Sequence, residues 1–249
     1  MNEGDAVATI RRLAPNFRPL GQGAIRPGRL YRSGTMTAFD QAAWAAVRAL
    51  GIRTLIDLRG TDEVDSMPVQ PPAGVKLVSV PMPAENSWDA EADHSTDQLA
   101  KAQMEQSYRQ IVASQGGAIA DVFRILAQEA AVPAVIFCTA GKDRTGIVSA
   151  LLLRAIGAAD QDLYSDYGGT NLALTGEARR RTLGFARRAS PFPLPSGAAG
   201  DAILSADQTY LDAALKEAGP VGAYLARHGI DPADIARLRK VFSASEAAA

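Results

Sequence analysis

The stretch from Cys138 to Gly146 holds the residues whose types and spacing point most directly to chemistry. It reads Cys-Thr-Ala-Gly-Lys-Asp-Arg-Thr-Gly, so five residues separate Cys138 from Arg144. An apolar, β-rich run at 132–138 precedes it and an apolar helical pattern follows, which predicts a strand leading into a loop and a helix leaving it. The backbone N–H groups of such a loop, with a helix N-terminus behind them, can surround one anion. The sequence therefore predicts a phosphate-binding loop.

Several side chains of this loop suit phosphoryl transfer. The loop amides and the helix favour the thiolate form of Cys138, which makes it a nucleophile. Arg144 offers a planar set of donors that matches two phosphate oxygens, and the Thr145 hydroxyl can donate to the departing thiolate. A lone cysteine is often a small buried hydrophobic residue, but the complete motif between a strand and a helix favours the nucleophile. We expect the bound phosphate to contact Thr139, Ala140, Gly141, Lys142, Asp143, Arg144 and Thr145.

The segments around the loop predict an α/β fold with a central, mainly parallel sheet flanked by helices. Apolar runs at 52–60 and 75–82 are expected strands, as is 132–138, and 24–34 is expected to be a strand or hairpin. Helical patterns alternate with these strands, which is typical of parallel sheets. They cover 38–50 with Thr37 as the cap and Gly51 as the stop, about 96–112, 118–130 after Gly116-Gly117, and the run after the loop as far as Gly157.

The part of the chain after Gly157 reads as a helical extension. Residues 189–201 carry many prolines and glycines and are expected to form a loop, followed by helical patterns at 203–218 and near 221–228. A last helix is expected with Asp231 as N-cap and Pro232 at its first position. We predict one phosphatase domain over 1–249, with an α/β core at 16–157, a phosphate loop at 138–146 and an extension at 158–249.

Composition excludes several classes of function. Lys plus Arg total 26 and Asp plus Glu total 27, so the net charge of −1 gives no reason to expect nucleic-acid binding. One cysteine and two histidines argue against a disulfide framework and against a metal site, and no cofactor is expected. No apolar run is long enough for an integral membrane span, and no signal peptide is apparent. We therefore expect a cytoplasmic protein; the sequence does not indicate its oligomeric state.

CTAGKDRTG resembles the signature of a bacterial tyrosine phosphatase family that carries a Lys-Asp pair in its phosphate loop. Further similar blocks lie at 16–21, where Pro19 replaces the family's Asp, and at 30–34, 56–64 and 221–230. The resemblance covers roughly the whole chain. It implies a cysteine-phosphatase fold and hydrolysis of phosphotyrosine, with phosphoserine, phosphothreonine or phosphoinositides as further substrates. One departure is Phe137, because the family usually has a His there that is taken to orient the loop.

The leaving oxygen needs a proton donor, and the resemblance points to Asp143. A neighbouring phosphate favours its protonated form, whereas the flanking Lys142 and Arg144 oppose it, so a carboxylate that braces the loop is the alternative. Asp57, at the end of a strand directed to the same edge, is a second candidate, although an ion pair with Arg59 is the favoured interpretation. Two further acids, Asp89 and Asp93, lie in the polar segment before residue 97 and are most simply surface residues.

Besides Arg144, three basic side chains are expected to lie in or next to the loop. Lys142 is predicted either to contact a second phosphate, as in a phosphoinositide, or to pair with a neighbouring carboxylate. Arg32 and Arg59 are expected to support the loop from behind, as is Asp57. The helical pair at 96–131 is a candidate lid, with the more polar first helix favoured for that role and the second favoured as core.

We conclude from the sequence that the chain is a cysteine-dependent phosphatase acting through a phosphocysteine intermediate. Its partners would be a phosphorylated protein or a phosphoinositide as substrate and inorganic phosphate as product. Other thiolate enzymes are less well supported: a rhodanese loop usually lacks the Arg-Thr pair, and arsenate reductases normally need further cysteines. A phosphate-binding module with little or no catalysis, or a structural domain, is the alternative of another class.

Overall fold

The computed structural model describes residues 1–83, 96–189 and 197–244 of the chain. Its five-stranded sheet consists of β1 (Arg18–Pro19), β2 (Leu30–Ser33), β3 (Thr54–Asp57), β4 (Lys76–Ser79) and β5 (Ala134–Phe137). The strand order is β1-β2-β5-β3-β4. β2, β5, β3 and β4 run parallel, and β1 pairs antiparallel with β2 at one edge. The expected α/β fold with a mainly parallel sheet is confirmed.

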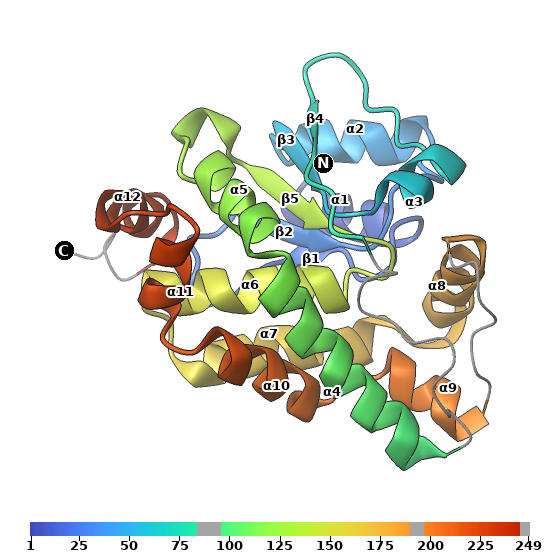
Figure 1. Ribbon diagram of the computed structural model, residues 1–249. Helices are drawn as coiled ribbons and strands as arrows, with labels where there is room; N and C mark the ends of the chain where they lie inside the picture. Colours follow the sequence, from blue (N-terminus) through green and yellow to red (C-terminus); the bar gives the residue numbers. More distant parts are fainter. Residues whose placement is uncertain (84–95, 190–196, 245–249) are drawn as a thin grey trace.

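Helices cover both faces of this sheet (Figure 1). α1 (Glu3–Arg11) and α2 (Gln41–Ala49) pack on one face, and α5 (Gly116–Leu126) and α6 (Asp143–Ile156) pack on the other. The remaining helices are α3 (Thr61–Ser66), α4 (Asp97–Ser114), η1 (Glu129–Ala131), α7 (Asp160–Ala173), α8 (Gly176–Ala189), α9 (Gly197–Leu204), α10 (Gln208–Ala218), α11 (Val221–Arg227) and α12 (Pro232–Phe242). α4 lies along α10 and α9, away from the sheet (Figure 1).

The central strand β5 places its residues alternately in two separate apolar clusters. Val135 and Phe137 belong to the cluster beneath α1 and α2. Ile136 and Cys138 belong to the larger cluster, which contains residues of α5 and α6. Since successive side chains of a strand point to opposite faces, this alternation sends Cys138 to the face that α6 covers.

Most of the expected elements are present, but several boundaries differ. The helix expected at 38–50 begins at Gln41, because Asp40 and not Thr37 is its N-cap and accepts a hydrogen bond from the Ala43 N–H at 2.8 Å. Gly116 does not separate two helices; it opens the second one. The apolar side of that second helix is buried, as predicted for a core helix.

The expected loop at 189–201 is wrong at its C-terminal end, since α9 begins at Gly197. Helical structure is not continuous over 203–218 either, because α9 ends at Leu204 and α10 begins only at Gln208. The last helix has the predicted start: Asp231 accepts from the Asp234 N–H at 2.8 Å and a proline follows it. The sequence did not indicate α1 or α3. Among the described residues, no helix is long and apolar enough to cross a membrane.

Candidate active site

Cys138 follows the last residue of β5, between β2 and β3 at the carboxyl edge of the parallel strands. Its side chain is buried and makes no disulfide. The chain then turns through 139–142 and enters α6 at Asp143. α6, which is 14 residues long, begins directly after the loop. Its free N–H groups and the positive end of its dipole therefore face the loop. The predicted strand–loop–helix arrangement is present.

Three successive carbonyl groups of the loop are held on its outer side. The Thr35 N–H donates to the Thr139 carbonyl at 3.0 Å. Asn16 Nδ2 donates to the carbonyls of Ala140 at 3.3 Å and of Gly141 at 2.7 Å. Because C=O and N–H of a trans peptide point in opposite directions, the next three N–H groups point to the inside of the loop. Within the described residues these N–H groups have no backbone partner, so they can bind an anion.

Asp166 of α7 anchors the underside of the loop. It forms an ion pair with Arg32 Nη1, and both side chains are buried. Arg32 Nη2 donates in turn to the Gly141 carbonyl at 2.7 Å, so the structure places Arg32 directly against the loop. Asp166 also accepts from the Gly21 N–H at 3.1 Å and, through its carbonyl, from Arg18 Nη2 at 2.7 Å. Sequence reasoning missed Asp166 because it lies in the extension, far from the motif.

Two glycines permit this close packing. Gly141 has a φ of +66°, and a Cβ there would lie 2.2 Å from the Ser33 carbonyl oxygen. A Cβ on Gly146 would lie 2.9 Å from the ring of Tyr167, which is itself buried. Both positions therefore exclude larger residues.

Arg144 is held by Glu63, a residue that the sequence analysis did not identify. Glu63 Oε2 pairs with Nη1 of Arg144, and Oε1 accepts from Nη2 at 2.9 Å. Nη1 also donates to the Met82 carbonyl at 3.0 Å. Of the five N–H donors of a guanidinium, this leaves the Nε donor and one Nη2 donor without a partner among the described residues. These two can bind phosphate oxygens, as predicted for Arg144.

Both carboxylate oxygens of Glu63 also accept hydrogen bonds from other residues. It also accepts from the Thr139 hydroxyl and from the Gly60 N–H at 2.8 Å. Burial alone would raise the pKa of Glu63, but the Arg144 charge and these hydrogen bonds lower it to about 2. Burial lowers the pKa of Arg144, whereas Glu63, then Cys138 and Asp143, raise it overall. The only signal for Glu63 in the sequence is its position in the 56–64 block.

Asp143 is contacted by Tyr108 and Lys142, and Tyr108 is contacted in turn by Tyr167. Tyr108 of α4 donates its hydroxyl to Asp143 Oδ1 at 2.8 Å, and the Tyr108 hydroxyl lies 2.7 Å from that of Tyr167 of α7. Lys142 Nζ pairs with the same Oδ1 at 3.0 Å. Lys142 is buried and also donates to the carbonyls of Ile203 and Ser205, so the structure shows the ion pair that was one of its two predicted roles.

Asp57 and Arg59 form a buried ion pair beside the loop. Arg59 donates from Nε to Oδ1 of Asp57 at 2.9 Å and from Nη2 to Oδ2 at 2.6 Å. Its guanidinium carbon lies 5.5 Å from the centre of the Phe137 ring. Phe137 therefore packs beneath Arg59, while Asn16 and Arg32 orient the loop. The structure places Asp57 in the ion pair that was favoured over an acid role.

The remaining candidates lie as follows. The Thr145 hydroxyl is buried and makes no hydrogen bond with any described residue, so its predicted contact with the thiolate is not formed in this structure. Asp89 and Asp93 lie outside the described residues. The candidate lid corresponds to α4 and α5, and α4 contributes Tyr108 to the loop; a closing motion stays a prediction.

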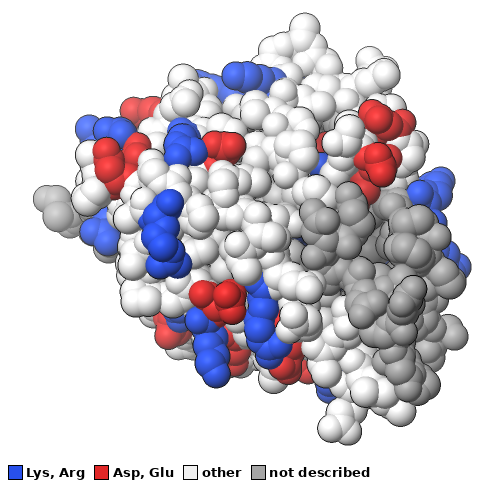
Figure 2. All heavy atoms as spheres, viewed as in Figure 1, with Lys and Arg blue, Asp and Glu red and all other residues white. Residues whose placement is uncertain are grey.

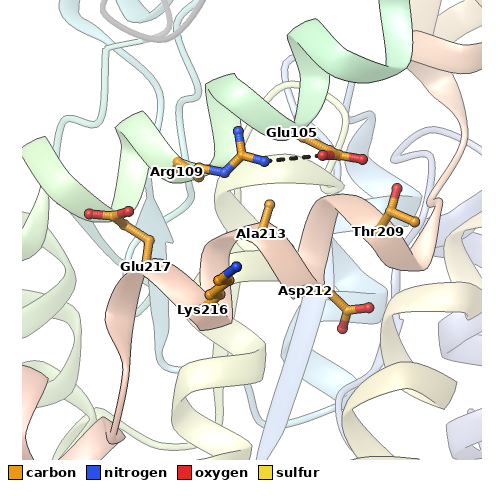
Figure 3. Close-up of a pocket in the computed structure, with 7 residues that line it drawn as sticks. All are labelled: Glu105, Arg109, Thr209, Asp212, Ala213, Lys216 and Glu217. Carbon is orange, nitrogen blue, oxygen red and sulfur yellow. Dashed lines mark hydrogen bonds and ion pairs between the residues drawn. The ribbon is translucent and has the colours of Figure 1, made fainter. Parts of the chain in front are cut away.

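The surface shows no broad patch of one charge on the face drawn in Figure 2, where basic and acidic side chains alternate. A hollow of about 490 Å³ between α4 and α10 is separate from the loop (Figure 3). It is lined by side chains of both charges: Glu105, Arg109, Thr209, Asp212, Ala213, Lys216 and Glu217. None of them belongs to the phosphate loop, so this hollow is not the site predicted from the sequence.

Comparisons with known proteins identify the family of the chain. Residues 12–244 match the model of the tyrosine phosphatase family. The chain is 31% identical to the triple specificity protein phosphatase PtpB of Mycobacterium tuberculosis, over 91% of this chain and 95% of that protein. It is 29% identical to a Cupriavidus necator protein assigned as a tyrosine-protein phosphatase, over 94% and 85% of the two chains.

Among solved structures, the Siw14 catalytic core is 17% identical over 69% of this chain and 83% of that chain, with a TM-score of 0.35. TpbA of P. aeruginosa is 18% identical over 71% and 86%, with a TM-score of 0.32. At these scores the two structures add nothing to the assignment. The family match spans nearly the whole chain and the similarity to PtpB is equally extensive, so the chain belongs to the tyrosine phosphatase family and is a phosphatase.

Proposed function

We propose that the chain hydrolyses phosphomonoesters, chiefly protein phosphotyrosine, through a phosphocysteine intermediate formed on Cys138. The observation that carries this proposal is the set of inward N–H groups at 140–142, held beside Cys138 and the two free donors of Arg144. Such donors bind the equatorial phosphoryl oxygens and stabilise their charge in the transition state. No metal is needed in this mechanism, because the loop and Arg144 supply the positive field.

The reaction takes place in two steps. In the first, the sulfur of Cys138 attacks phosphorus, the bond from phosphorus to the ester oxygen breaks, and Asp143 protonates that oxygen. In the second, water attacks phosphorus and gives a proton to Asp143, the S–P bond breaks, and inorganic phosphate and the thiolate are released. The Thr145 hydroxyl, which has no partner within 1–83, 96–189 and 197–244, is free to rotate and donate to the departing thiolate.

Hydrolysis of p-nitrophenyl phosphate in EDTA tests the reaction, with Cys138→Ser as the control variant. We expect turnover by the wild-type protein and none by Cys138→Ser. Equal turnover by the two would contradict the nucleophile. Binding of inorganic phosphate without any turnover by the wild-type protein would instead identify a phosphate-binding module.

The substrate is tested with phosphotyrosine, phosphoserine and phosphothreonine in one peptide sequence, and with a short-chain phosphoinositide. PtpB is named a triple specificity protein phosphatase, which supports testing more than one class of substrate. Lys142 is turned inward to two carbonyl groups, so its position does not support a second phosphate site at the rim of the loop. We expect the highest kcat/KM for phosphotyrosine; a higher value for the phosphoinositide would reverse this order.

A further inference from the structure

The two oxygens of Asp143 differ in their surroundings. Oδ1 accepts from the Tyr108 hydroxyl at 2.8 Å and pairs with Lys142 Nζ at 3.0 Å. Oδ2 has no partner among the described residues, and 31% of the side chain is exposed. A carboxyl group carries its proton on one oxygen only. A proton on Oδ1 would face two donors, so the proton is directed to Oδ2.

The donor character of Tyr108 is fixed by its neighbours. A phenol has one hydrogen, so when Tyr108 donates to Asp143, the hydrogen between the two tyrosines must come from Tyr167. Both rings are buried. Burial and then the charge of Asp143 raise the pKa of Tyr108 well above its ordinary value, and the same two causes raise the pKa of Tyr167. Both phenols therefore remain neutral donors at any working pH.

Lys142 is held equally firmly on the other side of Oδ1. Its side chain is buried, and its ammonium donates to the carbonyls of Ile203 and Ser205 at the junction of α9 and α10. The ammonium also lies 5.6 Å from the centre of the Tyr210 ring. Tyr108 of α4 and Lys142 thus contact the same oxygen of Asp143, and residues of α7, α9 and α10 hold these two side chains in place.

We propose that Tyr108 is a positioning residue, which together with Lys142 keeps Oδ1 of Asp143 as an acceptor and leaves Oδ2 to carry the proton to the leaving oxygen. This inference rests on the proposed role of Asp143 as the general acid. It gives α4 a direct part in the chemistry, because the helix supplies the hydroxyl that orients the acid.

Tyr108→Phe removes this hydroxyl and keeps the ring. We expect kcat/KM, which reports only the first step, to fall by about 10- to 100-fold for phenyl phosphate, whose leaving group needs a proton, because misplaced reacting groups cost about that much. For 2,4-dinitrophenyl phosphate, whose leaving group departs without a proton, we expect less than about a twofold change.

The pH dependence of activity is a second measurement, which a loss of packing alone would not change. Groups facing Asp143 are Lys142 and Arg144 from its own segment, Tyr108 from α4, Tyr167 from α7 and Tyr210 from α10. Only Tyr108 changes in the variant. Removing a donor to the ionised carboxylate favours the acid form. The alkaline limb of kcat/KM for phenyl phosphate should therefore move to higher pH.

Tyr224→Phe is the matched control, because its hydroxyl donates to the Val112 carbonyl of α4 at 2.9 Å and does not touch Asp143. We expect this control to keep the wild-type leaving-group dependence. An equal loss in both variants, or a Tyr108→Phe loss of the same size for both substrates, would overturn the proposal. Asp143→Asn distinguishes failure of this proposal from failure of the proposed function. If kcat/KM of Asp143→Asn falls equally for both substrates, Asp143 is not the general acid, and the error is not confined to the role of Tyr108.

Discussion

At the scale of single residues, the site depends on a carboxylate that holds its arginine. Glu63 leaves Arg144 two free donors and determines where they lie. In Glu63→Gln the buried guanidinium loses its counter-ion, which typically costs roughly 3–5 kcal/mol of stability. We expect a loss of that order in urea unfolding, together with a rise in KM as phosphate binding weakens.

Glu105→Gln is a suitable control for this change. Glu105 pairs with Arg109 at 3.1 Å on the half-exposed surface of α4 (Figure 3). Exposed pairs contribute less than about 1 kcal/mol, so this variant should keep its stability and its KM. Equal effects of the two substitutions would show that Glu63 has no special role at the loop.

The same carboxylate makes stability depend on acid. The pKa of Glu63 is lowered from 4.5 to about 2 on folding, so its contribution is present above pH 4.5 and is lost as the pH falls towards 2. At 1.36 kcal/mol per pKa unit, that contribution is about 3 kcal/mol. The difference in unfolding free energy between wild type and Glu63→Gln should therefore shrink between pH 4.5 and pH 2. A constant difference across this window would contradict the lowered pKa.

The sequence was most informative where the site is contiguous. Cys138, Arg144 and the glycines of the loop could be identified because strand, loop and helix follow one another without interruption. Glu63, Tyr108 and Asp166 could not, because each reaches the loop by tertiary packing from another element. Their side chains are common types whose role depends on which element lies next to them.

At the scale of elements, α6 and α7 fit together through Gly146. Glycine in a helix is normally less stable than alanine by about 1 kcal/mol. Here a Cβ would meet the Tyr167 ring at 2.9 Å, so we expect Gly146→Ala to lower the melting temperature and the activity. Gly168→Ala in α7 is the control, because its Cβ would meet nothing within 4 Å, and it should raise the melting temperature. Stabilisation by Gly146→Ala would mean that Tyr167 can move aside.

The fold was predictable wherever hydrophobic periodicity was strong. β5, its neighbours β2 and β3, and the helices α5 and α6 are apolar on their buried faces. This pattern could be recognised in the sequence. α9 was missed because its Gly- and Ala-rich start resembles a loop. The start of α2 was placed too early because Thr37 and Asp40 both suit an N-cap, and only the Asp40 side chain makes that bond.

At the scale of the whole molecule, the last helix, α12, is joined to the segment before β2. The Arg26 N–H donates to the Phe242 carbonyl at 2.8 Å, and the Phe242 side chain is fully buried in the larger apolar cluster. We expect Phe242→Ala to cost about 3–5 kcal/mol, whereas Leu172→Ala, at a side chain that is 84% exposed, should cost less than about 0.5 kcal/mol.

This pair of variants also tests the predicted single domain. If 16–157 and the extension form one cooperative unit, helical signal and phosphatase activity will be lost at the same urea concentration, and Phe242→Ala will shift both together. Activity that survives after part of the helical signal has gone would show that the extension unfolds separately.

The ion pair between Arg32 and Asp166 has a consequence for how this lineage can diverge. Arg32 alone would be a buried charge without its counter-ion beneath the loop, and Asp166 alone would keep only Arg18 nearby among the described residues; both changes are costly. Positions 32 and 166 should therefore mutate in concert among descendants of a common ancestor, although 134 residues separate them. A gene that keeps the nine-residue motif but has changed only one of positions 32 and 166 would be expected to encode a protein of reduced stability.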